Sequence, residues 1–143
     1  MFEMKYLRSL HYFQGLEVWR DSQQNFLRQG KYPRGLLKFF RMEKCKTSST
    51  PLQHNLKLCS DDGSKEVYDT LYRNLVGSLT YLTTTRTKLG YYVSVLSQFM
   101  SKPLEINWME ATSLLRYLHG SSNYGLLYTN KCDVILAGFS HSN

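Results

Sequence analysis

The sequence is poor in the residues that build a disulfide scaffold, a metal centre or a membrane span. It has three cysteines and no C-x-x-C pair, which is too few and too scattered for a disulfide framework. The four histidines lack the spacing of zinc ligands, so neither a metal site nor a cofactor is predicted. No run approaches the roughly 18 apolar residues that cross a bilayer, and no signal peptide is apparent. An intracellular protein away from the membrane is expected, with its compartment open.

Acidic residues are scarce only in the first part of the chain. Residues 1–60 hold 11 Lys/Arg against 4 Asp/Glu, whereas residues 61–143 hold 7 against 7. The net charge of +7 therefore arises entirely before residue 61. Such an excess favours polyanions such as nucleic acid, and a solubilising surface explains it equally well. With 42% hydrophobic and 14% aromatic residues, the chain is expected to fold as one domain of ordinary size.

The N-terminal part has the pattern of a β-hairpin. Residues 10–20 (LHYFQGLEVWR) alternate and are rich in aromatic and β-branched types, which predicts a strand. Residues 21–24 are turn-like, and residues 25–29 would return as a second strand. Because an isolated hairpin is only marginally stable in water, this one needs another element to pack on.

Residues 31–42 (KYPRGLLKFFRM) predict a short helix, with Pro33 tolerated in its first turn. At about 100° per residue, apolar and basic side chains fall on different sides of this helix. The apolar side holds Tyr32, Leu36, Phe39 and Phe40, and the basic side holds Lys31, Arg34, Lys38 and Arg41. The apolar side is expected in the core, and the basic side is either a solvated surface or a stripe that faces phosphates.

Residues 43–66 are rich in Ser, Thr and Asp and show no periodicity, which is typical of a linker. Three amphipathic helices are predicted after it, at about residues 69–82, 87–100 and 104–119. Asp69 or Thr70 is expected to cap the first of them. The predicted buried positions are Leu71, Leu75, Leu79 and Leu82, then Leu89, Val93, Leu96 and Met100, then Trp108, Ala111, Leu115 and Leu118.

Two further strands are predicted near the C-terminus, at residues 126–128 and 134–139, and they read as a hairpin. The predicted fold class is therefore α+β. It comprises an N-terminal β-hairpin with a short helix, a central three-helix region and a C-terminal β-hairpin. Because the last strand is apolar and stands near the end of the chain, truncation inside a larger domain is expected.

Several segments resemble copia-type retrotransposon polyproteins, in the order in which that family has them. They are LHYFQGLEV at 10–18, KYPRGLLKFFRMEKCKTSSTPL at 31–52, YRNLVGSLTYL at 72–82, SVLSQFMSKP at 94–103, RYLHGSSNYGLLY at 116–128 and ILAGFSHSN at 135–143. The resemblance covers nearly the whole chain. It corresponds to the C-terminal part of the reverse transcriptase, running into the first strand of ribonuclease H.

The resemblance implies a division of the chain. Residues 1–42 would be the hairpin and helix at the end of the polymerase palm, and residues 43–66 a linker. Residues 67–120 would be a helical region like a thumb or connection, and residues 121–143 the truncated start of a ribonuclease H-like domain. In the intact parent, this segment would help to hold the primer–template duplex during RNA-directed DNA synthesis.

The same resemblance implies that the chain is not an enzyme on its own. The Tyr-x-Asp-Asp strand, whose aspartates hold magnesium in the intact parent, would lie before Met1. Asp61 and Asp62 stand in the expected linker, without the rigid support that a metal site needs. At the other end, His141 and Asn143 occupy positions where the family shows acidic residues. No catalytic residue is therefore assigned, and the chain is expected to be a pseudoenzyme.

The expected partner is an RNA–DNA or DNA duplex. The expected contacts are Tyr12, Phe13, Gly15, Lys31, Arg34, Lys38 and Arg41, with Arg73, Arg86 and Arg116 as weaker candidates. Two alternatives stay open on the sequence alone. The chain is either a nucleic-acid-binding module retained by a host or a small helical protein whose exposed helix faces bind a protein partner.

Overall fold

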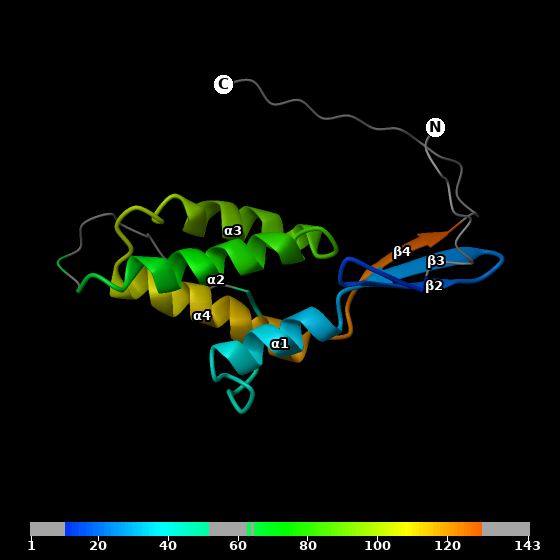
Figure 1. Cartoon of the computed structure of the whole chain (residues 1–143), viewed down its shortest axis with the longest axis horizontal. Coiled ribbons are helices and arrows are strands. Elements are labelled where there is room, and N and C mark those ends of the chain that lie inside the picture. The colour runs from blue at the N-terminus through cyan, green and yellow to red at the C-terminus, as the bar shows by residue number, and fades with distance from the viewer. Residues whose placement is uncertain (1–10, 52–62, 64, 130–143) are drawn as a thin grey trace, which may run out of the picture.

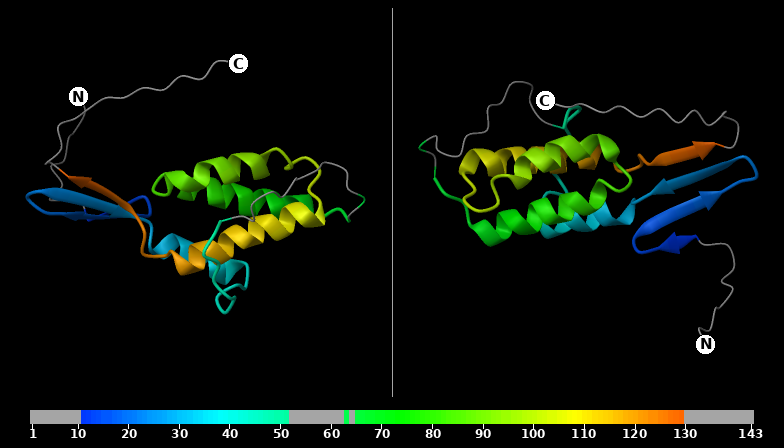
Figure 2. Two further views of the ribbon diagram at one scale, coloured as in Figure 1. Left: turned by 180° about the vertical axis from the view of Figure 1, so that it is seen from behind. Right: turned by 90° about the horizontal axis from the view of Figure 1, so that it is seen from above.

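A four-stranded antiparallel sheet lies at one end of a bundle of four α-helices (Figures 1 and 2). This computed structural model describes residues 11–51, 63 and 65–129. Within that part of the chain, the mixed helix–sheet class predicted from the sequence is confirmed. The assignment of the helices to a thumb and of the C-terminal strand to a ribonuclease H-like domain stays a prediction.

The sheet is formed by β1 (Tyr12–Phe13), β2 (Leu16–Arg20), β3 (Gln24–Arg28) and β4 (Leu126–Thr129), in that spatial order. The pairing of β2 with β3 is the predicted hairpin, and it sets Glu17 opposite Arg28. The two side chains form an ion pair at 2.9 Å between Nε and Oε2. Opposite charges at directly facing positions stabilise a pair of strands.

The predicted strand over residues 10–20 is wrong in one respect, because a tight turn at Gln14 and Gly15 divides it into β1 and β2. Both turn residues have positive φ, at 46° and 82°, as in the type I′ turns that suit the twist of a hairpin. A Gln-Gly pair inside an alternating pattern is a weak turn signal, and the alternation outweighed it in the sequence.

The last described strand has a partner that the sequence did not suggest. β4 forms at the predicted place but pairs with β3, with Phe26 opposite Leu127 and Leu27 opposite Leu126. The predicted partner, residues 134–139, lies outside the described residues. The helical bundle is therefore inserted between two neighbouring strands of one sheet.

The bundle comprises α1 (Lys31–Phe39), α2 (Asp69–Leu82), the short 3₁₀ helix η1 (Thr87–Leu89), α3 (Gly90–Ser97) and α4 (Glu105–Gly120). The three helices predicted after residue 66 are confirmed. η1 runs directly into α3, so the second of them begins with a tighter turn. The described residues of the expected linker (43–51, 63, 65 and 66) form no helix or strand, apart from an isolated β-bridge between Glu66 and Leu104. No helix of the described chain is long and apolar enough for a membrane span.

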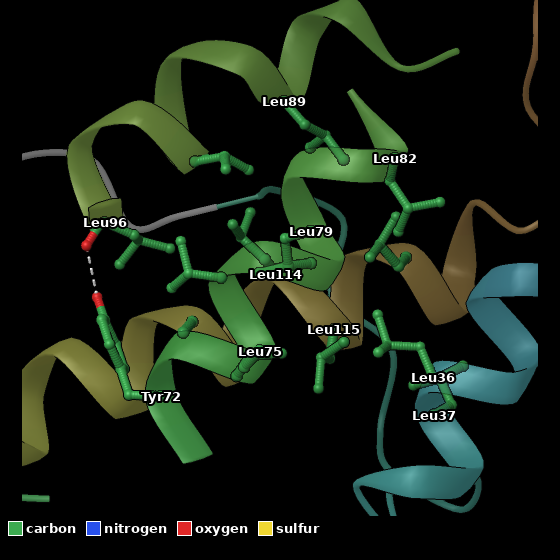
Figure 3. Close-up of a cluster of buried hydrophobic side chains, with 14 residues drawn as sticks. Leu36, Leu37, Tyr72, Leu75, Leu79, Leu82, Leu89, Leu96, Leu114 and Leu115 are labelled. Atoms are coloured by element: carbon green, nitrogen blue, oxygen red, sulfur yellow. Dashed lines mark hydrogen bonds between the residues drawn. The ribbon is translucent and has the colours of Figure 1, made fainter. Parts of the chain in front are cut away.

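The core lies among α1, α2, α3 and α4, and Figure 3 shows its leucines pointing toward one another. The predicted α2 face is shifted at its start, because Tyr72 is fully buried and Leu71 is 37% exposed. The Tyr72 hydroxyl donates to the Leu96 carbonyl at 2.8 Å, which satisfies the one polar atom that this ring brings inside. In α1, Leu37 takes the buried place expected for Phe39, which is 68% exposed.

The predicted cap of α2 is also wrong. The N-cap residue is Tyr68, and it makes no side-chain cap hydrogen bond. Asp69 is instead the first helical residue, and its carboxylate is engaged by Arg73 one turn later. An acid in the first turn still faces the positive end of the helix dipole, so it stabilises the helix without capping it.

Glu110 on α4 is buried, and its Oε2 has no hydrogen-bond partner. Burial raises the pKa of this carboxyl group, because the charged form loses hydration. The stability that goes with the protonated form is fully present below the unfolded-state pKa and is lost as pH rises through the folded-state pKa. The folded protein is therefore less stable at neutral pH than a chain with a neutral group at this position.

We expect Glu110→Gln to raise the free energy of unfolding at pH 7 by about 1 kcal/mol, since it removes a buried and poorly satisfied charge. The gain should vanish in acid, where Glu110 is protonated. Urea unfolding of both proteins from pH 4 to pH 8 measures this. Glu105→Gln is the matched control on the exposed first turn of the same helix. A Glu110→Gln gain that does not depend on pH would contradict the explanation.

Candidate nucleic-acid interface

A groove of about 550 Å³ runs between the β1–β2 turn, α1 and α2. Its lining residues are Tyr12, Gly15, Lys31, Tyr32, Gly35, Leu36, Phe39, Asn74 and Ser78. They include three aromatic rings, one cation and two small polar side chains, and no acidic residue. Such a surface offers rings for stacking and a positive charge for phosphate, with no carboxylate to repel a polyanion.

The groove is positioned by Tyr81 near the end of α2. Its hydroxyl donates to the Gln14 carbonyl in the β1–β2 turn, and its ring meets the Tyr32 ring edge-on, with 4.7 Å between centroids. Gly15 permits this approach, because a Cβ at that position would lie 2.7 Å from the Tyr81 hydroxyl oxygen. The turn is thereby held against the bundle, and Tyr12 is held at the mouth of the groove.

Tyr12 and Lys31 are exposed residues of the groove that contact each other. The Lys31 ammonium lies 5.0 Å from the centre of the Tyr12 ring, and 52% of Tyr12 is exposed. This distance is within the range of a cation–π contact. The predicted contacts Tyr12, Gly15 and Lys31 are thus brought together, although they come from two different elements.

The other basic residues of the prediction are exposed but do not line the groove. Arg34 and Lys38 lie three and seven residues after Lys31, so helical geometry places them beside it as a stripe along one edge. Arg41 lies beyond the end of α1, where its φ of 56° turns the chain out of the helix. The predicted cluster of four cations is therefore a stripe of three, with Arg41 apart from it.

Phe13 lies on the other side of the sheet from Tyr12, because neighbouring residues of a strand point to opposite faces. It lines a hollow of about 300 Å³ together with Leu16, Val18, Arg20, Asn25, Leu27 and Tyr128. Tyr12 and Phe13 therefore line different surfaces, and their role as contacts stays a prediction. The two rings are equally exposed, at 52% and 51%, but they serve different surfaces.

The sequence did not suggest several of the lining residues. Phe39 was expected in the core, and Gly35, Asn74 and Ser78 were not singled out. A helical signal was present, since Lys31, Gly35 and Phe39 are spaced by four residues, as are Asn74 and Ser78. Recognising it required knowing that α1 and α2 line the same groove.

The three weaker arginine candidates differ in availability. Arg86 is buried and binds the Ser121 carbonyl at 2.8 Å and its hydroxyl at 2.9 Å. Arg73 is engaged by Asp69 and by the Met100 carbonyl. Arg116 is exposed but lies on α4, outside the groove. None of the three contributes to the groove.

The groove does not fit the magnesium that the resemblance implies for an intact polymerase. Mg²⁺ is held in proteins by carboxylate oxygens, and none lines this surface. Over residues 11–51, 63 and 65–129, no group of three or more His, Cys, Asp or Glu side chains is placed to hold a metal ion. What the groove offers a ligand is three aromatic rings and one positive charge.

Comparison with known proteins gives relatives but no family model and no solved structure that matches. The chain is 36% identical over 99% of its length to the retrovirus-related Pol polyprotein from transposon RE2 of Arabidopsis thaliana. It is 31% identical, also over 99%, to that from transposon TNT 1-94 of Nicotiana tabacum. An uncharacterized mitochondrial protein of Arabidopsis thaliana is 34% identical over 99% of the chain. The chain spans 10% and 11% of the two polyproteins and 59% of the mitochondrial protein.

Proposed function

The chain is a homologue of one segment of copia-type retrotransposon Pol polyproteins, and from this premise we propose that it is a non-catalytic, duplex-binding segment of a reverse transcriptase. Its role in an intact parent is to hold the primer–template duplex. The observation that supports this most is the groove in which Tyr12, Lys31 and Phe39 meet without an acidic residue. Binding there depends on the phosphate backbone and on stacking, and so does not depend on sequence.

The positive stripe explains how a duplex is oriented on the groove. Lys31, Arg34 and Lys38 follow one edge of α1, and no acidic residue occurs in α1. Each contacts one phosphate, while Tyr12 and Phe39 offer their exposed rings to a base or sugar beside them. Three phosphate contacts predict that affinity falls about 40-fold when salt rises from about 50 to about 200 mM.

Fluorescence anisotropy with a labelled RNA–DNA hybrid at the two salt concentrations tests the proposal. We expect the combined Lys31→Gln, Arg34→Gln and Lys38→Gln variant to lose most of the affinity and most of the salt dependence. The matched control removes three exposed lysines outside the groove, by Lys46→Gln, Lys65→Gln and Lys102→Gln. An equal loss in the control, or no binding by the folded protein, would exclude this interface.

Phe13, the neighbour of Tyr12 in the sequence, provides a control for the aromatic part of the interface. Tyr12→Ala should weaken hybrid binding about fivefold or more, because a stacked base loses its platform. Phe13→Ala removes an equally exposed ring from the opposite face and should leave affinity within about twofold. Equal effects of the two substitutions would show that the rings act on folding rather than on binding.

A further inference from the structure

A second pocket, of about 440 Å³, lies where the α2–α3 connection meets the segment that leads into β4. Its lining residues are Phe26, Thr85, Arg86, Thr87, Lys88, Leu89, Tyr117, Asn123, Tyr124, Gly125 and Leu126. They include two cations and three aromatic rings. As in the groove at Tyr12 and Lys31, they include no acidic residue. The volume falls within the range of about 300–1,000 Å³ typical of small-molecule sites.

Arg86 is a buried residue among those that line this pocket. Only 7% of it is exposed, and its guanidinium donates to the Ser121 carbonyl and hydroxyl and, at 3.3 Å, to the Ser122 carbonyl. Its Nε has no acceptor, and no described carboxylate pairs with it. Burial lowers the pKa of this guanidinium. A buried charge without a counter-ion is costly, and an anion in the pocket would supply both the missing charge and the missing acceptor.

The remaining lining residues define the rest of the ligand. Lys88 and Thr87 are exposed beside Arg86 in the sequence, so they add a second cation and a hydroxyl to an anion site. Phe26 and Tyr117 are half-buried, whereas Tyr124 is 64% exposed. Rings of this kind bind a flat, unsaturated ring system by stacking. An anion joined to a flat ring describes a nucleotide.

We propose that this pocket binds one nucleotide, with its phosphate on Arg86 and Lys88 and its base against Tyr124 and Phe26. The nucleotide is either free or the 5′-phosphorylated end of a strand, since both present the same groups. The site is formed by other residues than the groove at Tyr12 and Lys31, so it does not rest on the function proposed for that groove.

Calorimetric titration of the full chain with adenosine monophosphate tests the site, with adenosine and inorganic phosphate as partial ligands. We expect saturable binding of the monophosphate and competition by inorganic phosphate. Lys88→Gln should weaken binding about tenfold, as expected for one hydrogen bond to a charged group. Tyr124→Ala should weaken it by a similar factor through lost stacking. Both residues are exposed, so both variants should fold, which circular dichroism checks.

Lys65→Gln is the matched control. Lys65 is exposed beside the start of α4, whereas Ser121 follows the end of that 16-residue helix, about 24 Å away at 1.5 Å per residue. Affinity should not change in this variant. Titration with tetranucleotides that carry or lack a 5′-phosphate distinguishes the two ligands. Tighter binding of the phosphorylated strand than of the free monophosphate would identify the ligand as a strand end. Absence of binding by every phosphate ligand, or equal weakening in Lys65→Gln, would overturn the proposal.

Discussion

Leu79→Ala is expected to lower the free energy of unfolding by about 3–5 kcal/mol, the range found for fully buried leucines. Leu79 is on α2 and is fully buried, in the cluster that joins α2 to the other helices (Figure 3). Truncation removes contacts and leaves a cavity that rigid neighbouring helices fill only in part. Urea unfolding followed by circular dichroism measures the change in the midpoint at constant slope.

Leu71→Ala on the same helix is the control, and it also decides the orientation of α2. Leu71 belongs to the predicted buried face, but the structure leaves it 37% exposed and buries Tyr72 in its place. We expect a cost below about 1 kcal/mol for this substitution. A loss at Leu71 that equals the loss at Leu79 would mean that α2 is rotated toward the orientation first predicted.

Gly125→Ala is expected to be the second most damaging substitution, at about 3 kcal/mol. A Cβ at this position would lie 2.3 Å from the Leu27 carbonyl oxygen and 2.9 Å from the Arg28 Cβ. The first of these atoms is backbone in β3, so relief requires the chain entering β4 to move away from its partner strand. Thermal unfolding measures the loss of stability. Hydrogen exchange of the β4 amides shows whether that loss lies in the pairing of β4 with β3.

Gly77→Ala is expected to stabilise the protein, in contrast to Gly125→Ala. Apart from the backbone of its own helix, no atom lies within 4 Å of a Cβ built at Gly77. The residue is on the exposed side of α2, where alanine is favoured over glycine by up to about 1 kcal/mol. The same change should therefore stabilise the protein at one glycine and destabilise it at the other. A neutral Gly125→Ala variant would contradict the close packing of β4 on β3.

The helices could be predicted from the sequence because their signal is local. Apolar spacing placed α2, α3 and α4 within a few residues of their ends, and most of the predicted buried leucines are in the core. The error at Leu71 has a physical cause. Leu71 and Tyr72 are adjacent and both fit the spacing of the buried face, and the Leu96 carbonyl supplies the acceptor that the Tyr72 hydroxyl needs inside.

The sheet and the groove could be predicted only in part, because they depend on residues that are distant in the chain. The alternating pattern was sufficient to predict that β2 pairs with β3. It could not predict that β4 pairs with β3, because the whole helical bundle lies between these two strands in the sequence. Similarly, Tyr12 and Lys31 were singled out one by one, whereas Phe39, Asn74 and Ser78 join them only because α1 and α2 line the same groove. Periodicity identifies the exposed side of a helix but not the neighbour that it meets.

The insertion of the bundle between β3 and β4 has a consequence for the order in which the protein folds. Gln24 pairs with Thr129, whereas β2 pairs with β3 across a short turn. Closing such a long loop from an unfolded chain costs entropy before any contact compensates it. Formation of the bundle brings the end of α4 close to the start of α1 (Figure 1) and shortens the effective loop. β4 should therefore join the sheet late. Its pairing register with β3 then depends on the helical bundle, although the bundle forms no part of the sheet.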